Sequence, residues 1–322
     1  LQLRLQAAKD RVARKAARGR APSREETEVP VKARPAALDR AMSVSDAFNA
    51  VIQASVAHLR ANESGMLQGR DPEYLHQMRV ALRRLRSALG VFTPILPVPK
   101  AATLRAEFKW LAACLGPARD WDVFVMETLP LIEAEFRQHD ALTSFIARCD
   151  KLRLSAGLRA RRAVRSARYR NLMRSLAAGI APQGQLTPFE HSTRAGLQPA
   201  IGDYAAALLE WRHQRAEKKS RRLGRQSPDA LHRFRIAIKN FRYAADTFAG
   251  LFEARAAREA LKRLSRLQDI LGVMHDAAIA ASLSDRALGG KPGRRERELR
   301  RRLLAWSRGR VTTLKRGLKG AW

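Results

Sequence analysis

Two segments of the sequence carry the same basic residues at the same spacing. Both follow the pattern His-x-x-Arg-x-x-x-(Arg or Lys)-x-x-Arg, formed by His76, Arg79, Arg83 and Arg86 and again by His232, Arg235, Lys239 and Arg242. Arginine donates paired hydrogen bonds to phosphate, lysine offers a point charge, and imidazole gains charge beside phosphate. Nothing in the pattern resembles a catalytic device, so it predicts the binding of an anion.

The repeated pattern belongs to an internal duplication. His232 follows His76 by 156 residues, and a second element repeats at the same offset. It reads Leu115-Gly-Pro-Ala-Arg-Asp120 in the first copy and Leu271-Gly-Val-Met-His-Asp276 in the second. Two elements that repeat in one register predict two related halves.

Each basic pattern is predicted to lie on an amphipathic helix. Asp71-Pro72 and Ser227-Pro228 are typical helix starts, because Asp or Ser caps the first turn and proline fits the first helical position. At ~100° per residue, the four basic residues of one copy share a stripe about 80° wide. Apolar residues such as Met78 and Phe234 lie on the opposite side, so one face packs and the other presents cations.

No acidic residue lies within the central basic segment of either helix. Neither the segment from Ala81 to Gly90 nor that from Ala230 to Ala245 contains Asp or Glu. Like charges one helical turn apart repel each other by a few tenths of a kcal/mol per pair. An external anion would relieve this repulsion. The alternative is a solvated basic face, which is common for a single helix and less so for a pattern kept in both copies.

Other basic residues are weaker candidates for the same anion. Arg119 and His275 follow the repeated Leu-Gly pair, but a terminating glycine and a capping aspartate explain that element equally well. The remaining candidates are neighbours of the basic stripes or lie on other helices: Arg84, Tyr243, Lys109, Arg266, Arg161, Arg165 and Arg168.

Composition favours an all-α protein with an anionic partner. The 322 residues carry a formal net charge of +32, while 46% of them are hydrophobic. Alanine, leucine and arginine dominate and β-branched runs are nearly absent, which favours helices. The net charge is explained most easily by a polyanionic partner, although a solvated arginine-rich surface is the plainer alternative. No apolar run of 18 residues occurs, so no membrane span is expected. Cys114 and Cys149 lack metal-type spacing and are expected to be reduced thiols of a cytoplasmic protein.

Apolar periodicity predicts ten helices in two groups. They cover about residues 43–62, 71–93, 101–115, 120–137 and 140–178, then about 196–222, 229–252, 254–271, 276–286 and 294–318. Residues 1–40 are expected to be a polar linker or the tail of a preceding domain. Residues 41–180 and 196–322 are expected to form two pseudo-symmetric antiparallel four-helix bundles, joined by a linker at 181–195, with a basic groove between them.

The doubled motif resembles the CHAD family, the conserved histidine α-helical domain. The resemblance rests on the segments from Leu75 to Arg86 and from Leu231 to Arg242, with the Leu-Gly-x-x-Arg-Asp element after the first. It covers about residues 43–322 and implies two four-helix bundles around a basic cavity. It also implies inorganic polyphosphate as ligand and association with polyphosphate granules.

The resemblance also has limits. CHAD domains often follow a CYTH triphosphatase domain, and residues 1–40 would then be the linker from it. The second copy departs from the family pattern at Lys239, Asn240 and His275, so the halves are expected to contribute unequally. The role of the family histidines is carried over to His76 and His232 alone.

Three functions compete at this point. The first is a non-catalytic polyphosphate-binding module without a cofactor. Sulfate or phosphate ions would also occupy its site. The second is a nucleic-acid-binding protein, against which the stripes lack interleaved aromatic residues. The third is a metal-dependent phosphohydrolase, which needs clustered carboxylates. The candidate carboxylates Asp120, Asp122, Asp269 and Asp276 are better explained as helix caps or surface groups.

Overall fold

The computed structural model of the chain describes residues 29–69, 71–93, 96, 98–178, 200–221, 228–289 and 293–318, leaving aside the side chains of residues 98, 228, 270, 273–278 and 310–318. Helices joined by turns make up nearly all of these residues, and no strand occurs among them. An isolated antiparallel bridge pairs Ser43 with Ala200. The all-α fold predicted from the sequence is therefore confirmed.

The helices of the first half follow the predicted order. They are α2 (Val44–Ala61), α3 (Glu63–Gln68), α4 (Pro72–Phe92), α5 (Val98–Val123), the π-helical turn η2 (Phe124–Thr128), α6 (Leu129–Glu135), α7 (Leu142–Val164) and α8 (Ala167–Ala178). Helix α4, which carries the first basic pattern, begins as predicted. The Asp71 carboxylate accepts a hydrogen bond of 2.7 Å from the backbone N–H of Glu73, and Pro72 occupies the first turn.

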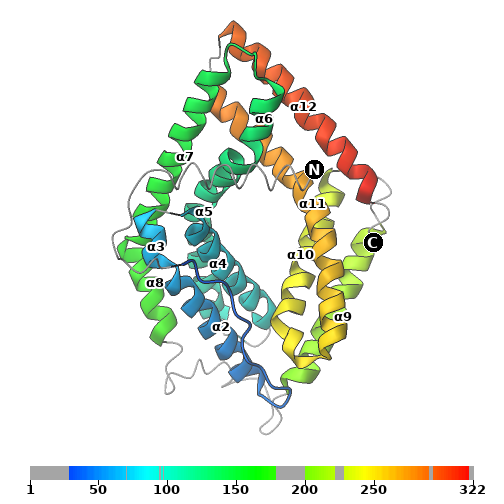
Figure 1. Cartoon of the computed structure of the whole chain (residues 1–322). Helices are drawn as coiled ribbons and strands as arrows, with labels where there is room; N and C mark the ends of the chain where they lie inside the picture. Colours follow the sequence, from blue (N-terminus) through cyan, green and yellow to red (C-terminus); the bar gives the residue numbers. More distant parts are fainter. Residues whose placement is uncertain are drawn as a thin grey trace.

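The second half repeats this order around the second basic pattern. It consists of α9 (Ile201–Ser220), α10 (Pro228–Phe248), the 3-10 turn η4 (Ala249–Leu251), α11 (Ala254–Leu288) and α12 (Arg294–Leu318). Helix α4 packs against α2 and α5, and α10 packs against α9 and α11 in the corresponding way. Figure 1 shows the two groups on opposite sides, with α4 and α10 facing each other and α11 reaching α7.

Two predicted helix breaks are wrong. Helix α5 runs on through Gly116 and Pro117, and α11 runs on through Gly272. In α5, Leu115, Ala118 and Trp121 are all at most 2% exposed, so apolar packing on both sides of the proline holds one continuous helix. The packing of this face outweighs the hydrogen bond that proline cannot donate. Asp120 therefore lies inside a helix and is not the N-cap that the sequence suggested.

The predicted single helix over 140–178 is also wrong, because it divides at Arg165 and Ser166. Helix α7 ends at Val164, and α8 begins at Ala167. The Ser166 hydroxyl accepts a 3.2 Å hydrogen bond from the backbone N–H of Tyr169, which caps the new helix. Such local side-chain bonds compete with continuation of a helix and give it a start point.

Aromatic rings join the two halves. The ring of Phe92 on α4 packs edge-on against Phe48 of α2 and Phe248 of α10, and stacks on Tyr204 of α9. The Tyr204 hydroxyl donates a 2.6 Å hydrogen bond to the carbonyl oxygen of Val91. The largest buried cluster accordingly contains residues from both halves. The division into two bundles stays a prediction, and the expected linker at 181–195 and residues 1–28 lie outside the described residues.

Candidate anion-binding site

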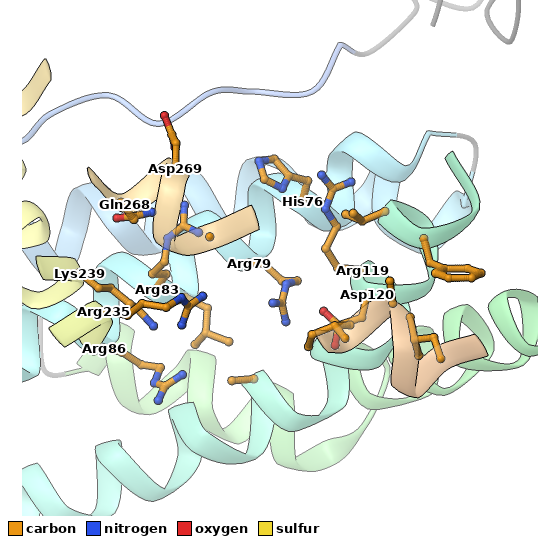
Figure 2. Close-up of a pocket in the computed structure, with 18 of the residues that line it drawn as sticks. His76, Arg79, Arg83, Arg86, Arg119, Asp120, Arg235, Lys239, Gln268 and Asp269 are labelled. Atoms are coloured by element: carbon orange, nitrogen blue, oxygen red, sulfur yellow. The ribbon is translucent and has the colours of Figure 1, made fainter. Parts of the chain in front are cut away.

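A cavity of about 440 Å³ lies where α4, α5, α10 and α11 meet. Its basic lining residues come from both copies of the pattern and from α5: His76, Arg79, Arg83, Arg86, Arg119, Arg235 and Lys239. Figure 2 shows these side chains around one space, with Lys239 and Arg235 on one side and Arg119 on the other. Residues from both copies of the pattern therefore line the same cavity in the folded chain.

Helix α4 contributes the complete first pattern. His76, Arg79, Arg83 and Arg86 all line the cavity, while Met78 and Leu85 on the opposite side are fully buried in the core. The one-sided placement follows from the 3.6-residue period of the helix. From His76 to Arg86 the row of charge extends for about 15 Å along the helix axis.

Helix α10 contributes only part of the second pattern. Arg235 and Lys239 line the cavity, whereas His232 is exposed and lies outside it. Arg242 turns toward α11, where its guanidinium donates hydrogen bonds to Gln268 Oε1 (2.7 Å) and Ser265 Oγ (3.3 Å). The two copies thus contribute unequally to the lining, because His232 and Arg242 lie outside it, whereas Lys239, where the sequence departs from the family pattern, lines it.

Tyr243 sits at the centre of the basic side chains. The guanidinium carbons of Arg83 and Arg242 each lie 5.3 Å from the centroid of its ring, and Lys239 Nζ lies 6.0 Å from it. The negative face of an aromatic ring attracts cations. The ring therefore holds cations from both halves close together in place of a carboxylate.

Burial, together with repulsion from neighbouring cations, makes Lys239, Arg79 and His76 costly to charge. The pKa of Lys239 is lowered to about 8, first by loss of hydration and then by Arg86, Arg235, Arg83 and Arg79. Burial is also the main cause that lowers the pKa of Arg79, with Asp120 acting in the opposite sense. Burial followed by Arg119 lowers the pKa of His76. A ligand with negative charge would reverse each of these shifts.

Carboxylates are outnumbered in the cavity. Six Arg and Lys side chains line it, against Asp120 and Asp269. Burial raises the pKa of Asp120, while Arg79 and Arg119 pull it back down. In addition, Arg235 Nε is buried and has no hydrogen-bond partner among the described residues. The site therefore has unmet capacity to bind negative charge.

The Leu-Gly element has a role in this site that sequence reasoning missed. A Cβ atom at Gly116 would lie 3.2 Å from Arg79 Nη1, so the glycine gives the guanidinium room. Gly272 lines the cavity, and a Cβ atom there would meet no heavy atom within 4 Å. Gly116 thus leaves room for a cavity cation, and Gly272 leaves the cavity wall open. The repetition of this element beside the basic pattern was the signal for its role.

Several candidate residues lie away from the cavity. Arg84 faces Asp246 at 3.7 Å, and Arg168 forms two hydrogen bonds to the Glu107 carboxylate while covering the ring of Trp110. The exposed residues Lys109, Arg165 and Arg266 and the half-buried Arg161 do not line it either. His275 lies in α11, but its side chain falls outside the described residues.

The sequence model of the CHAD domain matches residues 50–285. The chain belongs to the CHAD family. The crystal structure of the CHAD domain from the plant Ricinus communis is similar, with a TM-score of 0.78 and 32% identity over 91% of this chain and 96% of that one. PptA from Streptomyces chartreusis has the same fold, with a TM-score of 0.66 and 17% identity over 87% and 99% of the two chains.

Curated relatives of this CHAD chain are longer proteins. The uncharacterized proteins MT2285 and Rv2226 of Mycobacterium tuberculosis are each 28% identical to it over 221 residues. The match covers 64% of this chain and 39% of each relative.

The described part of this CHAD chain contains neither a cluster of metal-ligand side chains nor a membrane-spanning helix. Among the described residues, no three or more His, Cys, Asp or Glu side chains gather in a way that could hold a metal ion. No helix in the described part of the chain is long and apolar enough to cross a membrane. What the cavity offers is an array of hydrogen-bond donors with positive charge.

Proposed function

We propose that this chain binds inorganic polyphosphate in the cavity between its two halves. The observation that carries the proposal is the convergence of both basic patterns on one cavity, with six Arg and Lys side chains against two carboxylates. Such an arrangement repels itself when empty. Phosphate oxygens accept hydrogen bonds from these groups, and arginine binds them in pairs.

The length of the charged row supports a chain of phosphates over a single ion. The cations of α4 extend over about 15 Å along its axis. An extended polyanion can contact such a row at successive residues, whereas one phosphate ion can contact only a part of it. Membership of the CHAD family, whose resemblance implied polyphosphate, agrees with this choice. Sulfate or phosphate ions are expected to occupy parts of the same row.

We further propose that binding is the whole activity of this chain. Its described lining holds cations with Asp120 and Asp269, and no group of carboxylates that could hold a metal ion occurs among the described residues. Binding to polyphosphate would carry the protein to polyphosphate granules in the cytoplasm. Incubation of pure protein with polyphosphate and Mg²⁺ should release no orthophosphate, and sustained release would contradict a binding role.

The test of the binding site is a double variant with a matched control. Arg79→Gln/Arg235→Gln removes one cation from each half and should weaken polyphosphate binding at least tenfold, because each removed guanidinium loses charge-assisted hydrogen bonds. Arg258→Gln/Arg263→Gln removes the same charge from exposed positions on α11 and should bind nearly as wild type. Binding is measured by calorimetry and helix content by circular dichroism. Equal loss in both variants would show that net charge alone attracts the ligand.

Nucleic acid is the competing ligand for the same cations. Competition of long-chain polyphosphate against single-stranded RNA and duplex DNA at physiological salt decides between them. We expect polyphosphate to displace both, because three cations already lie within 6.0 Å of the centroid of the Tyr243 ring and compete with a base for it. Affinity should fall steeply as salt rises, since the contacts release counterions. Tighter binding of RNA or DNA would overturn the polyphosphate proposal.

A further inference from the structure

A second cavity of about 270 Å³ shares the lining residue Arg86 with the central one. It lies among α4, α9 and α10, and its lining residues are Arg86, Ser87, Gly90, Trp211, Arg212, Arg215, Ala237 and Asn240. Arg86 lines both cavities. The residues that line the second cavity include three arginines and no Asp or Glu, so no carboxylate of the lining balances their charge.

Arg212 shows that this cavity has unmet donor capacity. Its side chain is only 9% exposed, and its Nη1 and Nη2 donate to the carbonyl oxygens of Asn240 (2.6 Å) and Gly90 (3.2 Å). Its Nε is buried and has no hydrogen-bond partner among the described residues. Two neutral carbonyls orient the guanidinium but do not balance its charge. A buried charge without a counter-ion is costly, and an anion in the cavity would lower that cost.

Arg215 and Trp211 form the outer part of the cavity. The guanidinium carbon of Arg215 lies 5.2 Å from the centroid of the Trp211 ring. Trp211 is 52% exposed, which is unusual for so large an apolar side chain. A guanidinium resting on an aromatic face keeps its N–H groups at the edge available for a ligand. The ring therefore orients Arg215 without neutralising it.

We propose that the second cavity is a phosphate subsite, which takes the part of a polyphosphate chain that leaves the central cavity past Arg86. This inference rests on the proposed function, because it assigns the same ligand to a continuation of the same site. The chain would contact Arg86 at the boundary, then Arg212 and Arg215. A ligand long enough to reach both cavities would bind more tightly than one that fills the central cavity alone.

The test compares two ligands of different length. Arg215→Gln should weaken binding of polyphosphate about 100 phosphates long by roughly threefold to tenfold, the loss expected for a partly exposed charge-assisted contact. It should leave binding of tripolyphosphate unchanged. The control Arg258→Gln makes the same change at an exposed position on α11 that lines neither cavity. Loss of tripolyphosphate binding by Arg79→Gln/Arg235→Gln shows that the short ligand occupies the central cavity.

The fluorescence of Trp211 gives a second readout. Long polyphosphate should change the tryptophan emission of the wild type in a way that disappears in Trp211→Phe, and tripolyphosphate should not. If Arg215→Gln binds both ligands like Arg258→Gln, the subsite is overturned while the central site stands. If the wild type binds no polyphosphate at all, both proposals fail. If RNA binds more tightly than polyphosphate and depends on Trp211, the occupant is a nucleic acid and the phosphate subsite is wrong.

Discussion

At the scale of single residues, Lys239 shows the cost of gathering cations without a ligand. Its pKa falls to about 8, chiefly because burial removes its hydration. The unfolded chain holds this proton up to a pKa near 10.4. Between these two values the unfolded state binds more protons than the folded state. The stability of the unliganded protein should therefore rise with pH from about 8 to about 10.

Lys239→Met should remove this pH dependence. The variant keeps an unbranched side chain without the charge, so at pH 7 it should stabilise the unliganded protein by about 1–2 kcal/mol, a value reduced for partial solvent screening. It should also weaken polyphosphate binding. Thermal unfolding of wild type and variant at pH 7.5, 8.5 and 9.5 measures the first effect, with Lys218→Met on the exposed side of α9 as control. A variant that keeps the wild-type slope would exclude Lys239 as its cause.

At the scale of helices, the continuity of α5 and α11 matters more than the turns that their sequences suggest. Each helix passes through its Leu-Gly element without a break. Gly116 of α5 lies beside the Arg79 guanidinium, and Gly272 of α11 lines the cavity. A glycine inside a helix costs about 1 kcal/mol relative to alanine. Its presence in both copies is consistent with a need for space at these positions.

Gly272→Leu should therefore separate stability from binding. A Cβ atom at this position meets nothing within 4 Å, so the first atom of the new side chain has room and the rest of it extends into the space of the cavity. The helix should gain up to about 1 kcal/mol of stability, while polyphosphate binding falls because the ligand's space is filled. Gly272→Ala is the matched control, since it gains the same backbone stability and adds little volume. The thermal midpoint and binding affinity of both variants measure the difference, and equal binding by both would contradict the role of the space.

At the scale of the whole molecule, the two halves share their core. The fully buried ring of Phe92 contacts Phe48 in the first half of the chain and both Phe248 and Tyr204 in the second half. The cavity lies between the same halves, so the aromatic contacts of Phe92 that hold the halves together also set the distance between the two rows of cations. When no ligand is bound, repulsion between the cations of α4 and those of α10 acts against these aromatic contacts.

Phe92→Ala should weaken both halves at once. Removal of a buried ring costs about 3–5 kcal/mol. Because the ring packs against α10 as well as α2, amide hydrogen exchange should accelerate in the peptides of both helices. Phe145→Ala, which removes a buried ring that contacts Phe124 within the first half, is the comparison. If α10 keeps its wild-type exchange rate in Phe92→Ala, the halves are independent units.

Much of the helical fold and the basic pattern follows from the sequence, because both depend on local periods. The 3.6-residue period places His76, Arg79, Arg83 and Arg86 on one side, and Asp71 with Pro72 marks where that helix starts. The duplication, read from the repeated spacing, indicated that two such helices exist. These are properties of neighbours along the chain, which composition and spacing can determine.

Only the tertiary structure decided which cations face one another. Arg235 and Arg242 belong to the same stripe, but Arg242 bonds to Gln268 and Ser265 while Arg235 lines the cavity. Asp120 likewise appears as a cap in the sequence and as a cavity residue in the fold. A stripe of about 80° is wide enough to face two neighbouring helices. The angle and distance at which distant helices pack therefore select its members, and no local pattern contains that information.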